Sequence, residues 1–143
     1  MKTLKRTWAD ISLDNLEYNY RSIRAHLPQG TKFLGVMKAD AYGHGAVPVS
    51  RALADLGAEY LAVSNLEEAV QIRRGEVRLP ILILGYTHPT QFPQLLQYDL
   101  TQAILDLDYA KALAAYGPVK GHLALDTGMH RLGLDAGNHD AIG

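Results

Sequence analysis

The sequence contains no cysteine, which excludes disulfide bonds and thiolate metal ligands. No apolar run approaches the roughly 18 residues that a membrane-spanning helix requires. The formal net charge is only −1, with both signs interspersed, so the surface carries no basic footprint for nucleic acid. The basic start, MKTLKRTWAD, is not followed by the apolar segment of a secretory signal. We therefore expect a cytoplasmic protein that binds neither membranes nor nucleic acid.

What the sequence does contain is a regular alternation of apolar runs and helical patterns. With 143 residues, of which 48% are hydrophobic and 20% charged, the chain is long enough for one domain with a core. Strand patterns are followed by helical ones at intervals of roughly 20–27 residues, the length of a βα unit. We expect strands at 32–37, 59–64, 79–85, 101–106 and 119–126, and helices at 14–27, 46–56, 64–75, 90–98 and 108–117.

These strands are apolar throughout rather than alternating, which indicates a parallel sheet covered by helices. An open doubly wound sheet and a (β/α)8 barrel both have this signature. No G-x-G-x-x-G follows the first strand, which argues against a dinucleotide site. If the fold is a barrel, the chain holds about five of its eight strands.

Two helix starts carry the pattern of a capping box, in which a polar N-cap residue is followed three positions later by glutamate. The first pairs Asp14 with Glu17, and the second pairs Ser64 with Glu67. We therefore predict Asp14 and Ser64 as N-caps.

Lys38 directly follows the first predicted strand, in a loop that runs to Gly45. In parallel α/β folds, active sites lie where the carboxyl ends of the strands open into loops. The lysine is either a surface amine that extends into solvent or a nucleophile. Burial disfavours the charged form of an amine, and a neutral amine can condense with an aldehyde, which is how proteins hold pyridoxal phosphate.

Tyr42 and Arg131 are the other candidates for this chemistry. The Tyr42 phenol either donates to a phosphate and orients the lysine, or packs on the rim of the barrel. Arg131 lies in a second distinctive loop, DTGMHRLG, after the fifth predicted strand. Its guanidinium suits the phenolic oxygen of a pyridine cofactor or a carboxylate, and the alternative is an ion pair with Asp126 or Asp135.

A group of histidines and aspartates near the C-terminus raises the question of a metal site. Its members are His130, Asp135, His139 and Asp140. Glycines between them break any fixed helical spacing, and no metal-ligand motif is present, so we expect no metal site.

Three segments are specific enough to indicate a family. VMKADAYGHGA closely resembles the pyridoxal phosphate attachment motif of bacterial alanine racemases. TWADISLDNLEYNYRSIR resembles the N-terminus of that family, and LALDTGMHRLG its other internal signature. The resemblance runs along the whole chain in order. It implies a fold-type III enzyme, in which a (β/α)8 TIM barrel carries pyridoxal 5'-phosphate, a mostly β domain follows, and two copies form a homodimer.

The resemblance also implies roles for individual residues. Lys38 would hold the cofactor and act as the base on one face of the substrate Cα. Tyr42 would contact the cofactor phosphate, and Arg131 the phenolic oxygen of its ring. The family usually has a lysine, often carbamylated, where this chain has Ala124, so the brace for Arg131 is missing. The other base is a tyrosine of the C-terminal β domain, contributed across the dimer interface.

The implied domain organisation has three parts. Residues 1–11 would pack with the C-terminal β domain, residues 12–143 would form the N-terminal part of the barrel, and the β domain itself would be absent from these 143 residues. The chain is then a fragment or a truncated product, and we expect no useful racemase activity from it alone.

The function implied is that of an isomerase that interconverts L-alanine and D-alanine by proton transfer at Cα and supplies D-alanine for peptidoglycan. Two alternatives stay open. One is a serine or broad-specificity amino-acid racemase, and the other is a truncated, non-catalytic barrel that binds the cofactor.

Overall fold

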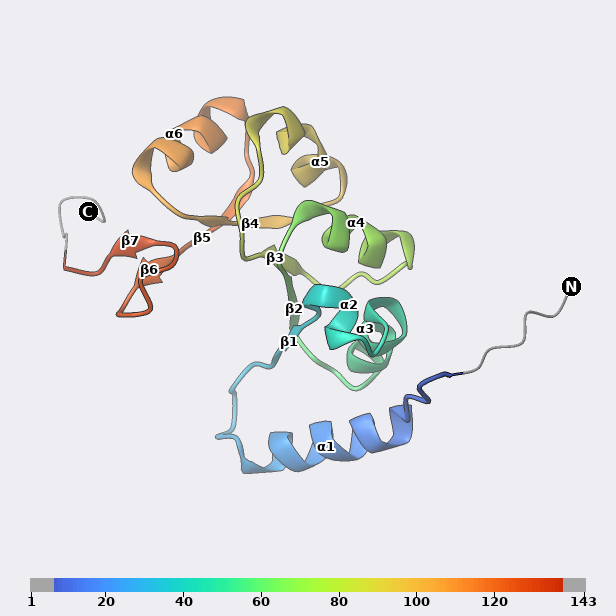
Figure 1. Cartoon of the computed structure of the whole chain (residues 1–143). Helices are drawn as coiled ribbons and strands as arrows, with labels where there is room; N and C mark the ends of the chain where they lie inside the picture. Colours follow the sequence, from blue (N-terminus) through green and yellow to red (C-terminus); the bar gives the residue numbers. More distant parts are fainter. Residues whose placement is uncertain (1–6, 138–143) are drawn as a thin grey trace, which may run out of the picture. The chain divides into compact units, whose positions relative to one another are not determined.

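The structure, a computed structural model, describes residues 7–137 (Figure 1). The chain divides into two compact units, residues 1–31 and 32–143. The first unit contains helix α1 (Leu13–His26). Its N-cap is Ser12, whose side-chain oxygen accepts a hydrogen bond from the Asn15 N–H at 3.2 Å. The predicted cap, Asp14, is wrong: it lies in the first turn, where its charge favours the positive end of the helix dipole.

The second unit alternates strands and helices. Its sheet strands are β1 (Leu34–Val36), β2 (Tyr60–Val63), β3 (Ile81–Ile83), β4 (Thr101–Ile104) and β5 (Lys120–Leu123). Its helices are α2 (Lys38–Tyr42), α3 (Ala46–Asp55), α4 (Leu66–Arg74), the 3₁₀ turn η1 (Pro89–Gln91), α5 (Phe92–Gln97) and α6 (Leu107–Tyr116). No helix within residues 7–137 has both the length and the apolar character needed to cross a membrane.

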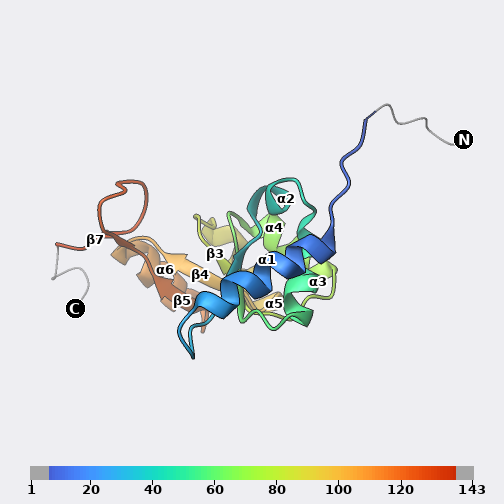
Figure 2. The ribbon, with the colours of Figure 1, turned by 90° about the horizontal axis from the view of Figure 1, so that it is seen from below.

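The strand order decides between the two architectures that the strand pattern left open, and it confirms the barrel that the family resemblance implied. The five strands are parallel and neighbour one another in chain order, β1-β2-β3-β4-β5 (Figure 1), and the second view shows β3, β4 and β5 one after another (Figure 2). Right-handed crossovers that always advance in one direction place every helix on the same face of the sheet. Helices α2 to α6 accordingly follow one side of the strands in Figure 1. A doubly wound sheet would reverse direction, so this is part of a (β/α)8 barrel.

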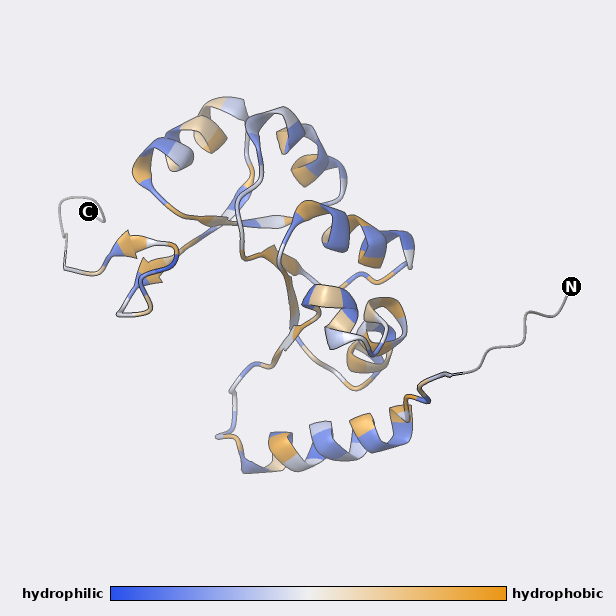
Figure 3. Ribbon diagram, in the orientation of Figure 1, coloured by the Kyte–Doolittle hydropathy of each residue, from blue (hydrophilic) through white to orange (hydrophobic). Residues whose placement is uncertain are grey.

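Each face of the sheet contributes its own apolar layer, and strands β2 and β3 are hydrophobic along their length (Figure 3). One face packs on the helices: a Cβ added to Gly35 would lie 2.6 Å from Leu53 of α3, so glycine allows this helix to approach closely. Residues on the other face form a second cluster. Its buried members are Ala62, Leu82, Ala103 and Leu105, with Val36, Tyr60 and Ala124 packed against them.

The N-terminus of α4 differs by one residue from the prediction. Asn65, not Ser64, is the N-cap, and its Oδ1 accepts from the Glu68 N–H at 3.0 Å. The Glu68 carboxylate, not that of Glu67, reaches back to accept from the Ser64 N–H at 2.7 Å. Two successive polar residues suit the cap equally well by pattern. Ser64 directly follows β2, so the helix starts one position later.

The predicted strand 119–126 is interrupted at Ala124. Its first part is β5, and its last part, β6 (Leu125–Asp126), pairs in parallel with an unpredicted strand, β7 (Leu134–Asp135). The Ala124 N–H donates to the Ile104 carbonyl of β4 at 3.0 Å, while the Ala124 carbonyl accepts from the Leu134 N–H at 2.8 Å. A Cβ at Gly133, which has φ +111°, would lie 2.8 Å from the Ala124 carbonyl oxygen. Glycine is therefore needed where β7 approaches.

We predict that the polypeptide of residues 1–143, prepared alone, self-associates through its β5 edge. All four β5 residues are exposed, and within residues 7–137 only β4 pairs with this strand. Unpaired strand edges join other chains, and a lysine on the edge opposes this. Sedimentation should show concentration-dependent oligomers that Leu123→Lys shifts toward monomer.

The matched control is Leu107→Lys, because Leu107 on α6 is as exposed as Leu123, at 47% each. It should leave self-association unchanged. A monodisperse monomer at every concentration, or equal effects of the two lysines, would contradict the role of the edge.

Candidate active site

Lys38 lies at the carboxyl end of β1. The Met37 N–H donates to the Ala62 carbonyl oxygen at 2.7 Å, so pairing with β2 continues up to the residue before the lysine. Lys38 itself is half-buried. The strand end therefore holds the backbone in register with β2 up to the residue before the lysine.

The loop expected after Lys38 is a left-handed helical turn. Ala39, Asp40, Ala41 and Tyr42 all have φ between +51° and +55°. In this conformation Cβ crowds the following carbonyl oxygen, which costs roughly 1–2 kcal/mol for each residue with a side chain. A run of four such residues without glycine is not predicted by the sequence, and it needs compensating contacts.

Backbone hydrogen bonds close the turn. The Ala41 N–H donates to the Met37 carbonyl at 2.9 Å, and the Gly45 N–H to the Asp40 carbonyl at 2.9 Å. His44 Nδ1 lies 2.9 Å from the Ala41 carbonyl oxygen, which can only accept, so Nδ1 carries the proton. Gly43 and Gly45, on either side of His44, also have positive φ, at +86° and +91°, where glycine has no steric cost.

Two carboxylates anchor the ends of the turn, and sequence reasoning missed both. Asp40 Oδ1 accepts from the Ala46 N–H, at the start of α3, at 2.6 Å. Glu68 Oε1, from the first turn of α4, accepts from the Ala39 N–H at 2.8 Å. A carboxylate makes shorter and stronger hydrogen bonds to N–H groups than a neutral acceptor does. Only Glu68 has a signal in the sequence, its spacing of three positions from Asn65, and that pattern by itself is typical of a helix cap.

The turn brings Tyr42 back to Lys38. The Lys38 Nζ lies 5.7 Å from the centroid of the Tyr42 ring, within the range of a cation–π contact. Tyr42 is 61% exposed, so one face of its ring borders the lysine and its hydroxyl is open to a ligand. No carboxylate among residues 7–137 lies within ion-pair distance of the Lys38 amine. The amine is therefore not occupied by a salt bridge.

Arg131 lies in the connection between β6 and β7 and is exposed. The preceding turn is organised by Asp126, whose Oδ1 accepts from the N–H groups of Gly128 at 2.9 Å and His130 at 3.0 Å. These N–H groups, that of His130 first, lower the pKa of Asp126. In the described part of the chain neither Asp126 nor Asp135 forms an ion pair with Arg131, so that alternative is wrong.

The structure brings Tyr42 to Lys38 but shows no contact between Lys38 and Arg131. Strands β1 and β5 are the two edges of the sheet, with three strands between them. Within residues 7–137 no three histidine, aspartate or glutamate side chains are grouped to hold a metal ion. His139 and Asp140, from the histidine and aspartate group of the sequence, lie outside the described residues.

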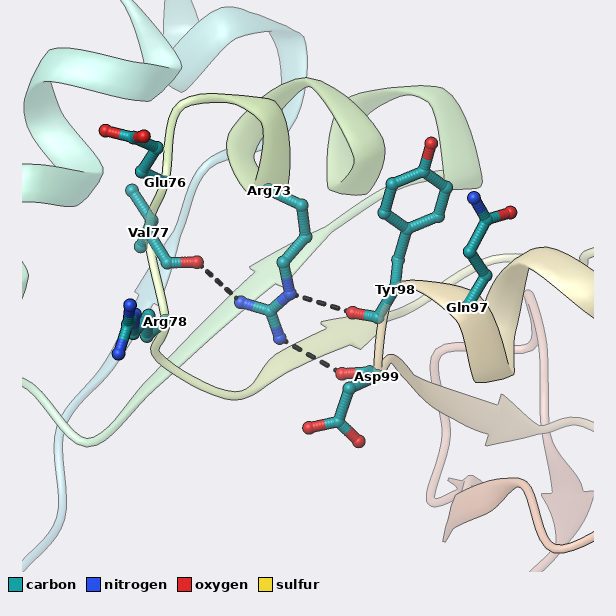
Figure 4. Close-up of a pocket in the computed structure, with 7 residues that line it drawn as sticks. All are labelled: Arg73, Glu76, Val77, Arg78, Gln97, Tyr98 and Asp99. Atoms are coloured by element: carbon teal, nitrogen blue, oxygen red, sulfur yellow. Dashed lines mark hydrogen bonds between the residues drawn. The ribbon is translucent and has the colours of Figure 1, made fainter.

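A pocket at the opposite end of the strands has a structural role (Figure 4). It lies where the chain enters β3 and β4, the end of a barrel that usually serves stability. The Arg73 guanidinium donates to the carbonyls of Tyr98 at 2.9 Å, Asp99 at 3.0 Å, Val77 at 2.8 Å and Leu79 at 2.6 Å. Burial lowers the pKa of Arg73, and the charge of Asp99 partly opposes this shift. The pocket is lined by Arg73, Glu76, Val77, Arg78, Gln97, Tyr98 and Asp99.

Comparisons with known proteins agree with one another. The family described as "Alanine racemase, N-terminal domain" matches residues 11–142. An alanine racemase of Clostridium novyi (strain NT) is 42% identical over 138 residues, which are 93% of this chain and 35% of the relative. A solved alanine racemase of Clostridium difficile 630 superposes with a TM-score of 0.90 at 35% identity, over 97% of this chain and 38% of that one. A second structure of that protein, in complex with cycloserine, has a TM-score of 0.90 at 36% identity, over 96% and 39% of the chains.

The left-handed turn predicts opposite effects for one substitution at two sites. Ala39→Gly should raise the free energy of unfolding by about 0.5–1 kcal/mol, because glycine relieves a cost of roughly 1–2 kcal/mol but loses more backbone entropy on folding. Ala114→Gly, at an exposed position of the right-handed helix α6, should lower it by about 0.5–1 kcal/mol. Urea unfolding of both variants measures the difference. Equal destabilisation by both glycines would show that residue 39 is not left-handed.

Proposed function

Because the chain belongs to the alanine racemase family, we propose that it carries the cofactor lysine for the pyridoxal phosphate-dependent interconversion of L-alanine and D-alanine. The observation that carries the proposal is Lys38, which lies at a strand end, outside any ion pair of the described residues and beside Tyr42. The chain spans 35% of the length of its Clostridium novyi relative, so we propose the activity for a protein of the full length of that relative and not for these 143 residues alone.

The residues present fit the cofactor. An aldehyde needs a primary amine, and Lys38 offers one that is half-buried. A phosphate needs donors, and the exposed Tyr42 hydroxyl is one. A Cβ added to Gly43 would meet no atom within 4 Å, so the turn leaves open space on that side. Arg131 would serve the phenolic oxygen of the ring, by the resemblance in its loop.

When bound, pyridoxal phosphate delocalises the electron pair that remains at Cα after its proton is removed. Lys38 Nζ, once released, would remove the proton from one face of Cα in one direction of the reaction and deliver a proton to that face in the other direction, and removal requires a neutral amine close to Cα. The Tyr42 ring, whose centroid lies 5.7 Å from Nζ, would limit the conformations that the Lys38 side chain can adopt. A tyrosine from the C-terminal β domain of a second copy would serve the other face, as the family resemblance implies.

The proposal extends to assembly and cellular role. Two copies would form a homodimer in the cytoplasm, and the D-alanine produced would supply peptidoglycan. Residues 1–11 would pack with the C-terminal β domain, and residues 12–143 would belong to the barrel. The similar Clostridium difficile structure in complex with cycloserine supports a small-molecule site on this fold.

We expect Lys38 to carry the cofactor covalently. Incubation of the chain with pyridoxal phosphate followed by borohydride should fix a pyridoxyl mass on the peptide that contains Lys38. Lys38→Arg should abolish this label, because guanidinium stays protonated and cannot condense. In a longer protein with the C-terminal domain, Lys38→Ala should abolish racemisation.

The control is Lys32→Ala, which removes an exposed lysine six positions away and should leave the label intact. A label on another lysine, with Lys38 unmodified, would refute the assignment. A label on Lys38 without racemisation by the longer protein would favour the non-catalytic barrel.

A second experiment tests whether Arg131 needs a brace from position 124. Ala124 packs against the apolar cluster on the face of the sheet that carries no helices. If Ala124→Lys becomes carbamylated, its negative charge would brace Arg131 toward the ring. Cofactor affinity of the variant should then rise in bicarbonate, measured by titration with pyridoxal phosphate, while the wild-type affinity should not change. No response to bicarbonate would mean that Arg131 needs no such brace in this chain.

A further inference from the structure

We propose that Glu68 is a positioning residue for Lys38: its carboxylate holds the peptide unit that follows the lysine and thereby aims the lysine side chain. This inference rests on the proposed role of Lys38 as the cofactor lysine. It concerns a residue of α4, thirty positions along the chain, that does not touch the lysine amine within ion-pair distance.

The two oxygens of Glu68 join two different strand ends. Oε1 accepts from the Ala39 N–H, after β1, at 2.8 Å. Oε2 accepts from the Ser64 N–H, after β2, at 2.7 Å. The bond to Ser64 is partly buried, so water competes less for it than at an open surface, whereas the bond to Ala39 is exposed and relies on the charge of the carboxylate. The carboxylate is thus a bracket between the lysine turn and the neighbouring βα unit.

The bond to Ala39 acts on Lys38 through the rigid peptide plane. The Ala39 N–H and the Lys38 carbonyl belong to one planar unit, so fixing the N–H direction fixes the ψ angle of Lys38. On the other side, the Met37 N–H is held by the Ala62 carbonyl at 2.7 Å. The β2–α4 unit therefore holds the backbone directly after Lys38 and one residue before it, and the lysine side chain leaves a backbone that is restrained at both positions.

Capping of α4 alone does not account for this arrangement. In an ordinary capping box the glutamate returns to the N–H of the N-cap residue itself. Here it binds the N–H of Ser64, one residue earlier, and its second oxygen binds outside the helix. The cap of α4 is supplied separately by the Asn65 side chain, which accepts from the Glu68 backbone N–H at 3.0 Å. The carboxylate can therefore be changed without removing the cap.

Glu68→Gln is the sharpest change. Both oxygens of Glu68 accept from N–H groups, so the amide that replaces one of them sets an NH₂ donor against an N–H donor. We expect hydrogen exchange at the Ala39 or Ser64 amide to accelerate about tenfold or more. We also expect pyridoxal phosphate attachment to Lys38, trapped by borohydride, to slow by about tenfold.

Two control variants separate positioning from charge and stability. Glu67→Gln makes the same charge change in the same turn, at an exposed glutamate that does not contact Ala39. It should leave exchange and attachment unchanged. Asn65→Ala removes the cap and should lower the free energy of unfolding by about 1 kcal/mol, with attachment to Lys38 close to the wild-type rate.

The outcomes distinguish this inference from the proposed function. Attachment at equal rates in Glu68→Gln and wild type, with Lys38 labelled in both, would overturn the positioning role and leave the function standing. Unchanged amide exchange at both Ala39 and Ser64 would overturn the bracket itself. Failure of wild-type Lys38 to react would overturn the proposed function and, with it, the positioning role.

Discussion

The left-handed turn of residues 39–42 is the constraint on which the site depends. Four residues with side chains adopt a conformation that costs roughly 1–2 kcal/mol each, so the turn persists only because its surroundings determine it. Asp40 ties its far end to α3, and Glu68 ties its near end to α4. The consequence is that the turn places the Tyr42 ring next to the Lys38 amine, although Tyr42 is only four positions further along the chain.

The candidate site and the Arg73 hydrogen bonds lie at opposite ends of the strands. Because strands β1 to β5 run parallel, their carboxyl ends all lie at one end of the sheet, and the lysine turn lies at that end. At the amino ends of the strands, the Arg73 side chain donates to four backbone carbonyls and so joins the segments that lead into β3 and β4. We therefore expect a change at the Arg73 end to act on folding alone, whereas a change at the lysine end acts on folding and, by the proposed function, on cofactor attachment as well.

Both the family comparisons and the contacts in the structure draw attention to Lys38, but each supplies information that the other does not. The comparisons cover nearly the whole chain and show the family and the barrel fold. They do not by themselves say how this chain aims its lysine. That follows from the local contacts, in which Glu68, for which the sequence predicted only a place in a helix, joins two strand ends.

The sequence by itself determined the class of fold and the place of Lys38, because apolar runs at regular spacing encode strands buried on both faces. It also indicated most helices to within two residues at either end. Tertiary structure alone decided the break at Ala124 and the left-handed turn. The turn could not be predicted because none of residues 39–42 is glycine, the usual sign of positive φ. The Glu68–Ala39 bond could not be predicted because it joins groups 29 residues apart. Local pattern reports periodicity and burial, whereas which donor meets which acceptor is settled only when neighbouring βα units pack together.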